Sequence, residues 1–157
     1  MSFEITHRNL CIKAAKYLRS NGIHPWHRAQ YSVYELERTG ESPDAFAWGN
    51  SSTQLIEAKI SRSDFLSDKK KLWRKIPYYG LGKFRSYLCP INIIKPEDLP
   101  KHWGLLYIDE KGKITKIKEA SSQESNHIEE INLITSILRR EGIKPKMFSY
   151  KVYKNNK

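Results

Sequence analysis

Two features of the sequence predict a single α/β domain with a central mixed sheet and helices on both faces. Apolar residues recur at helical spacing near the start and near the end of the chain, and short runs rich in aromatic and β-branched residues lie between them. A chain of 157 residues is also long enough to bury most of its unfolded surface around one core. We therefore expect one domain over residues 1–157, with a basic tail at 144–157 whose apolar-aromatic alternation is compatible with a terminal strand.

The first half of the chain is expected to form a helix, a meander of three strands and a second helix. Asn21-Gly22 supplies a stop signal for the first helix, and turns rich in Gly, Ser and Thr separate the strands. Ser61 can cap the second helix, with Asp64 in the position of a capping-box acid. The expected elements are a helix over 5–20, strands over 29–36, 44–48 and 53–60 with a tight turn starting at Gly49-Asn50, and a helix over 61–75.

The second half is expected to add three strands and a last helix. Pro77 and the Gly80-Leu81-Gly82 turn end the second helix, and Pro90 follows the next strand. Asn126 can cap the last helix and Gly142 can end it. The expected elements are a strand over 84–89, a hairpin with strands over 105–109 and 114–118, and an amphipathic helix over 126–142.

The charge balance favours a polyanionic partner. Lys and Arg number 28 against 17 Asp and Glu, which leaves a formal net charge of +11. Nucleic acid, and DNA in particular, is the first candidate, because clustered cations gain affinity by releasing counterions from phosphates. Charge alone is equally compatible with a basic surface that has no such partner. The sequence also leaves a homodimer open.

The expected compartment follows from three features that the sequence lacks: a membrane span, a signal peptide and a disulfide framework. No run of apolar residues is long enough to span a bilayer, and the first residues have neither the basic nor the apolar region of a signal peptide. Cys11 and Cys89 each lie within a pattern of core residues, so a disulfide framework is not expected. We expect a cytoplasmic protein with no membrane association.

The third expected strand carries two charges inside an otherwise apolar run, 54–60. Because a strand presents alternate residues to one face, Leu55, Glu57 and Lys59 point the same way, and Glu57 and Lys59 are neighbours. A half-buried acid and lysine are costly to desolvate unless each has a partner. A divalent metal and a phosphate group would supply those partners. The pair Pro43-Asp44, at the preceding strand, offers a second carboxylate.

Pro43-Asp44 and Glu57-Ala58-Lys59, in the order helix, three strands, helix, strand, resemble the PD-(D/E)XK nuclease-like superfamily, which has the restriction-endonuclease-like fold. The runs 57–70 and 99–106 look like an uncharacterised branch related to MmcB-like DNA-repair proteins and phage proteins. The resemblance covers most of residues 5–140. It implies an αβββαβ core, to which this chain adds a C-terminal hairpin and helix.

The resemblance implies a metal-dependent DNA endonuclease that hydrolyses phosphodiester bonds, in DNA repair or in processing of phage or mobile-element DNA. Asp44 and Glu57 would bind Mg²⁺ or Mn²⁺, and Lys59 would orient or help to deprotonate the attacking water. Carboxylates are hard oxygen ligands of the kind magnesium requires, and a metal-bound water is a stronger nucleophile. Two alternatives stay open: a catalytically silent nucleic-acid-binding module with the same fold, and a protein-interaction domain in which the Glu57–Lys59 pair is structural.

The local acid-x-Lys pattern also occurs elsewhere in the chain. Asp68-Lys69-Lys70 and Asp109-Glu110-Lys111 satisfy it, and we expect these to form a solvated helix face and a hairpin turn. Only 57–59 lies in an apolar strand. The element order and Pro43-Asp44 therefore carry the assignment.

A third acid is often supplied in this superfamily by the first helix or the first strand. Glu35 and Glu37 are the candidates here, and we prefer Glu35 because it lies in the apolar part of its expected strand. Glu35 is equally compatible with a surface acid on an edge strand.

The helix expected after the motif carries cations on two faces. Arg62 and Lys69 fall near the centre of its apolar stripe, so they could reach the metal-site carboxylates or a DNA phosphate, or extend past the apolar rim to water. Lys70 and Arg74 belong to the outer face with Lys71 and Lys75, where a solvated charge run is expected and contact with DNA is the functional alternative.

Overall fold

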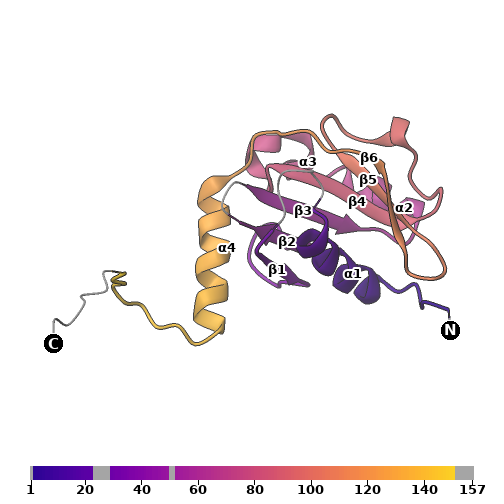
Figure 1. Ribbon diagram of the computed structural model, residues 1–157. Helices are drawn as coiled ribbons and strands as arrows, with labels where there is room; N and C mark the ends of the chain where they lie inside the picture. Colours follow the sequence, from indigo (N-terminus) through magenta and orange to yellow (C-terminus); the bar gives the residue numbers. More distant parts are fainter. Residues whose placement is uncertain (1, 23–28, 50–51, 151–157) are drawn as a thin grey trace.

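Six strands form one mixed sheet in the order β1-β2-β3-β4-β5-β6 (Figure 1). The computed structural model describes residues 2–22, 29–49 and 52–150. Strands β1 to β3 form an antiparallel meander, β4 pairs parallel with β3, β5 pairs parallel with β4, and β6 returns antiparallel. This confirms the expected α/β class and mixed sheet. The strands are β1 Tyr31–Tyr34, β2 Ala45–Trp48, β3 Thr53–Ala58, β4 Phe84–Pro90, β5 Gly104–Ile108 and β6 Ile114–Lys118.

Helix α1, His7–Ser20, packs across one face of the sheet (Figure 1). The Thr6 hydroxyl begins it by accepting a hydrogen bond from the Asn9 N–H. Alanines of β2 and β3 meet the helix, and their small side chains allow close approach. The first turn of α1 therefore lies beside the start of β2. The buried contacts join Leu10, Cys11, Ala14, Ala15 and Leu18 of α1 with Ala45, Ala47, Ile56 and Ala58 of the sheet.

The opposite face packs against the later helices. Helix α2, Arg62–Asp68, and helix α4, His127–Arg140, contribute Phe65 and Leu133 to a second core cluster. Tyr87 of β4 lies between two rings, with its centroid 5.0 Å from that of Phe65 and 4.4 Å from that of Trp103. Both faces of the sheet are thus covered, as expected. Two short 3₁₀ turns, Pro77–Tyr79 and Pro96–Asp98, complete the connections.

The segment from Ser61 to Lys75 forms two helices, so the prediction of a single helix is wrong. Helix α2 ends at Asp68, and helix α3, Leu72–Lys75, follows the extended residue Lys71. In one continuous helix, positions 68 and 74 would lie about 120° apart around the axis. The break lets both side chains turn inward, where Asp68 Oδ2 lies 2.8 Å from Arg74 Nε.

Strand β1 and the segment after α4 differ from the predicted elements. Strand β1 ends at Tyr34, and the φ of 48° at Glu35 takes the chain out of the extended conformation. Helix α4 ends at Arg140, and residues 143–150 form neither helix nor strand but extend away from the sheet (Figure 1). The terminal strand is therefore not formed over 144–150. Asn50 of the predicted turn and residues 151–157 lie outside the described residues.

Two further expectations concern cysteines and membranes. Cys11 and Cys89 are both buried and unbridged, as the core pattern around each of them predicted. Among the helices that the structure describes, none has the length and apolar character needed to cross a bilayer.

Candidate functional site

Asp44, Glu57 and Lys59 converge at one end of the sheet. Ala45 of β2 pairs with Ile56 of β3 in antiparallel register, so the residues that flank this pair, Asp44 and Glu57, lie at the same end. Lys59 Nζ lies 3.2 Å from Glu57 Oε2 and 3.9 Å from Asp44 Oδ2. One ammonium group therefore contacts both predicted metal ligands.

The Asp44 carboxylate is fixed from three sides. Its Oδ2 accepts a hydrogen bond from the Ala58 N–H at 2.9 Å, and His7 Nε2, from the first turn of α1, lies 3.2 Å from Oδ1. Burial raises the pKa of Asp44, but the hydrogen bond to His7 and the charge of Lys59 outweigh it and hold the pKa below the usual value. The side chain keeps 16% exposure. Asp44 is thus an ionised carboxylate with access to solvent.

Glu57 lies deeper in the molecule. Its side chain is only 3% exposed, and Oε1 lies 3.4 Å from a guanidinium nitrogen of Arg74. Burial, followed by the negative charge of Asp44, raises the pKa of Glu57 to about 7, against the opposing charges of Arg74 and Lys59. A further cation at this position would favour the ionised form.

Asp68 supplies a third carboxylate, which the sequence analysis missed. We expected this residue on a solvated helix face, but its side chain is 1% exposed and Oδ1 lies 3.5 Å from Lys59 Nζ. The Tyr87 hydroxyl donates to Oδ2 at 2.7 Å. Burial raises the pKa of Asp68, and the charges of Arg74 and Lys59 reverse this and hold it well below the usual value. Its spacing of three residues from Phe65 was a signal that it shares the buried stripe of α2.

Arg74 is buried within this cluster, so its predicted place on an outer face is wrong. The side chain is 1% exposed and pairs with Glu41, Glu57 and Asp68. The physical reason is the break before α3, which rotates the last turn inward. Glu41, in a segment that we expected to be only a turn, is fixed by accepting a hydrogen bond from the Leu81 N–H at 2.8 Å.

The cluster is rich in negative charge. Burial lowers the pKa of Lys59, but the charges of Glu57, Asp68 and Asp44 raise it above the usual value, so the ammonium form persists. Two buried cations face a larger set of acids, and two groups nearer the solvent, His7 and Lys71, stand at the rim. The buried cations are Lys59 and Arg74, and the acids are Glu41, Asp44, Glu57 and Asp68.

A cleft of about 340 Å³ opens over the cluster. His7, Lys59, Asp64, Asp68 and Lys71 are among the residues that line it. Solvent and small ions can therefore reach Lys59 from the side of α1 and α2.

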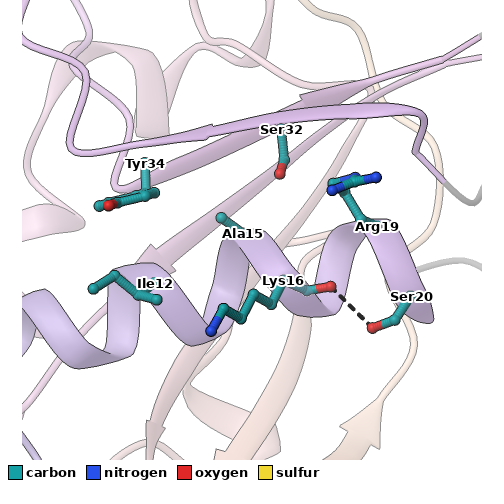
Figure 2. A pocket seen from close by; sticks show the side chains of 7 residues that line it. All are labelled: Ile12, Ala15, Lys16, Arg19, Ser20, Ser32 and Tyr34. Atoms are coloured by element: carbon teal, nitrogen blue, oxygen red, sulfur yellow. Dashed lines mark hydrogen bonds between the residues drawn. The ribbon is translucent and has the colours of Figure 1, made fainter.

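Larger hollows lie elsewhere and have a different character. One of about 470 Å³ lies between α1 and β1, where Lys16 and Arg19 stand near Ser32 and Tyr34 (Figure 2). Another, of about 750 Å³, lies between α4 and the edge of the sheet. Neither hollow is lined by a pair of acids, whereas Asp64 and Asp68 both line the smaller cleft.

Glu35 is not part of the cluster around Lys59. Its positive φ places it beyond the end of β1, and its carboxylate lies 2.7 Å from the guanidinium of Arg8. Its backbone contacts the site, because the Glu35 N–H donates to the Asp44 carbonyl at 3.0 Å. Asp68, rather than Glu35, is the third carboxylate beside Lys59.

Arg62 and Lys69 do not pair with the carboxylates around Lys59, which was one of the alternatives that the sequence left open. Arg62 makes two hydrogen bonds to the Asp98 carboxylate, at 2.8 and 2.9 Å. Lys69 Nζ donates to the Asp98 carbonyl at 3.0 Å and lies over the Phe65 ring. Both cations therefore hold the turn at Pro96–Asp98 rather than the carboxylates. Lys70 is exposed, as expected.

Comparison with known proteins gives a fold relationship. No protein-family model matches the sequence, and no curated protein matches it. Among solved structures, the chain is similar to the SPO1766 protein of unknown function from Silicibacter pomeroyi, with a TM-score of 0.59 and 21% identity. The match covers 88% of this chain and 91% of that one. At 21% identity, this similarity indicates a shared fold only.

Proposed function

We propose that this protein is a metal-dependent DNA endonuclease of the PD-(D/E)XK nuclease-like kind, which hydrolyses phosphodiester bonds with Mg²⁺ or Mn²⁺. The single observation that carries the proposal is the convergence of Asp44, Glu57 and Lys59, with Lys59 lining a solvent-open cleft. The order α1-β1-β2-β3-α2 followed by β4 supports it, since it agrees with the αβββαβ core of the superfamily that the motif resembles.

The donor set fits a hard divalent cation. Asp44 and Glu57 offer carboxylate oxygens, and the excess of acids over buried cations leaves negative charge for an ion to neutralise. A bound metal would supply an activated water and charge stabilisation at the phosphate. His7 and Ala58 hold the Asp44 carboxylate in place, so this ligand is oriented before any ion arrives.

Lys59 is the residue suited to act on water and phosphate. Its ammonium lies between the Glu57 and Asp68 carboxylates, which fix its position at the floor of the cleft. Preorganised positive charge at the reacting group stabilises a transition state that gains negative charge. Asp68 is itself anchored by Tyr87 and Arg74, and we therefore assign it a positioning role for Lys59.

The ion pairs within the cluster support a second candidate function, a nucleic-acid-binding module without catalytic activity. Lys59 and Arg74 already pair with all four acids, so the cluster can stand as a structural network. A silent nucleic-acid-binding module with the same fold would keep this network and the basic surface without turnover. Nucleic-acid affinity is expected under both functions, and only metal-dependent cleavage separates them.

The experiment is cleavage of labelled duplex, single-stranded and branched DNA with Mg²⁺ or Mn²⁺. Asp44→Asn and Glu57→Gln should abolish cleavage while DNA binding persists, because each removes ligand charge with little change in volume. Lys59→Ala should abolish cleavage and retain metal, and Asp68→Asn should cause an intermediate loss. Glu110→Gln, at an exposed carboxylate of the β5–β6 hairpin, is the matched control. Cleavage that is unchanged in Asp44→Asn, or absent from the wild type on every substrate, contradicts the proposal.

A further inference from the structure

A histidine and a cysteine one helical turn apart lie beside Asp44. His7 and Cys11 share a face of α1, and each of the three residues offers one ligand atom within 4.8 Å of the others. Nitrogen and sulfur are donors that the proposed magnesium chemistry does not use. The proposed magnesium site therefore does not explain why His7 and Cys11 lie beside its ligand Asp44.

The spacing of the three side chains suits one small cation. His7 Nε2 lies 3.2 Å from Asp44 Oδ1, and Cys11 Sγ lies 3.7 and 3.8 Å from the two ring nitrogens of His7. In a tetrahedral zinc site with Zn–N and Zn–O near 2.0–2.2 Å and Zn–S near 2.3 Å, neighbouring ligand atoms are roughly 3.3–3.6 Å apart. The separations of His7 from Asp44 and from Cys11 are close to these values, and the Cys11 sulfur lies within 4.8 Å of the carboxylate.

An entry path and a rigid support are also present. His7 is 46% exposed and lines the cleft, Asp44 is 16% exposed, and Cys11 is fully buried beneath them. Helix α1 is fixed by its buried face, so His7 and Cys11 keep their relative positions. A cation entering the cleft would meet the imidazole and the carboxylate first and the sulfur last.

We propose that His7, Cys11 and Asp44 form a binding site for a borderline divalent cation of the Zn²⁺ type, distinct from the oxygen-lined magnesium site and sharing Asp44 with it. Thiolate and imidazole ligands select zinc and related metals over magnesium. On binding, the Cys11 S–H bond breaks, a metal–sulfur bond forms, and the proton leaves to solvent.

The shared carboxylate gives the site a consequence for activity. An ion held by His7 and Cys11 would occupy Asp44 and so compete with the magnesium on which cleavage depends. Zinc is then an inhibitor of the nuclease, and this part of the inference rests on the proposed function. Binding of zinc itself does not depend on that function.

Cobalt binding tests the site directly, because a cysteine thiolate bound to Co²⁺ gives an intense near-ultraviolet charge-transfer band. Wild-type protein titrated with Co²⁺ alone should develop this band at one equivalent, and Zn²⁺ should displace it. Cys11→Ala should lose the band, and His7→Ala should weaken binding by at least about tenfold, the loss that even outer-shell partners of a metal ligand cause. Cys89→Ala, which removes a buried cysteine of β4, should leave the band unchanged.

The outcomes separate this inference from the proposed function. Glu57→Gln should bind Co²⁺ as tightly as the wild type, although it is expected to have no cleavage activity. No thiolate band in the wild type, or the same band in Cys11→Ala, overturns the zinc site whether or not the protein cuts DNA. If Cys11→Ala does not fold by circular dichroism, the exposed His7→Ala variant decides: wild-type affinity in it also overturns the site.

Where cleavage is observed, zinc inhibition provides the second readout. Each variant is compared with its own rate in the absence of zinc, and half-inhibition in Cys11→Ala should require at least about tenfold more Zn²⁺ than in the wild type. Equal sensitivity of the two proteins to zinc contradicts the shared-ligand arrangement.

Discussion

Two groups of ion pairs flank the same short helix and differ in their surroundings. Arg74 is 1% exposed and pairs with carboxylates that are themselves buried, whereas Arg62 is 49% exposed and pairs with Asp98 at the surface. The contact distances are similar, since Arg74 Nε lies 2.8 Å from Asp68 and a guanidinium nitrogen of Arg62 lies 2.8 Å from Asp98. Geometry alone therefore does not distinguish them.

Solvent distinguishes the two groups. At the surface, water replaces a lost partner at little cost, and salt screens the attraction. In the buried cluster, removal of Arg74 leaves the buried Glu41 carboxylate without its counter-charge and takes one of the cations away from Asp68. The comparison indicates that the buried network fixes the site, while the surface pair only holds the turn at Pro96–Asp98.

The largest effect is expected from Arg74→Ala. Because it leaves the buried Glu41 carboxylate unpaired, it should lower the free energy of unfolding by about 3–5 kcal/mol in urea denaturation. Lys75→Ala, at the exposed neighbouring position of α3, is the control and should have little effect. If both variants unfold at the same urea concentration, the Arg74 network does not support the fold.

The second prediction concerns pH and uses Glu57. Burial raises its pKa from 4.5 to about 7, so the folded protein holds a proton there that the unfolded chain has already released. Stability should therefore fall as pH rises through the interval from 4.5 to 7, by about 3 kcal/mol.

Asp68 contributes with the opposite sign. Its pKa lies below the usual 3.8, so its stabilisation is present at neutral pH and is lost only as the pH falls below that value. Urea unfolding of metal-free protein between pH 4.5 and 6 isolates the Glu57 effect, because the raised pKa of His7 adds its own slope only at higher pH. The slope should vanish in Glu57→Gln, and a slope that persists in this variant would assign the titration to another group.

The sequence predicted the central part of the candidate site because that part depends on strand order. Asp44, Glu57 and Lys59 lie at the ends of two adjacent antiparallel strands, where alternation and one turn determine which side chains meet. The same logic predicted the meander and the helices on both faces. These features follow from local patterns and survive small errors in element boundaries.

The remaining parts of the site depend on contacts that local patterns do not encode. Asp68 and Arg74 meet only because the helix breaks at Lys69–Lys71, where no proline or glycine announces a break. Glu41 lies in a turn whose sequence gives no sign of burial. His7 was overlooked because its partner Asp44 is 37 positions away along the chain. Glu35 lies outside the cluster because its strand ends at Tyr34, two residues before the expected end at position 36.

The smallest effects are expected at the surface cations, and they refine the comparison for DNA binding. Lys70 is exposed and makes no ion pair within the part of the chain that the structure describes, whereas two hydrogen bonds to Asp98 occupy Arg62. Neither Lys70→Ala nor Arg62→Ala should shift the urea midpoint measurably.

Each phosphate contact contributes about 0.9 to the slope of log K against log salt concentration for duplex DNA. Lys70→Ala should therefore reduce the slope by about 0.9, and Arg62→Ala should leave it unchanged. Binding isotherms for one labelled duplex at four salt concentrations measure both. A reduced slope in Arg62→Ala would show that DNA displaces Asp98, and an unchanged slope in Lys70→Ala would remove Lys70 from the DNA-binding surface.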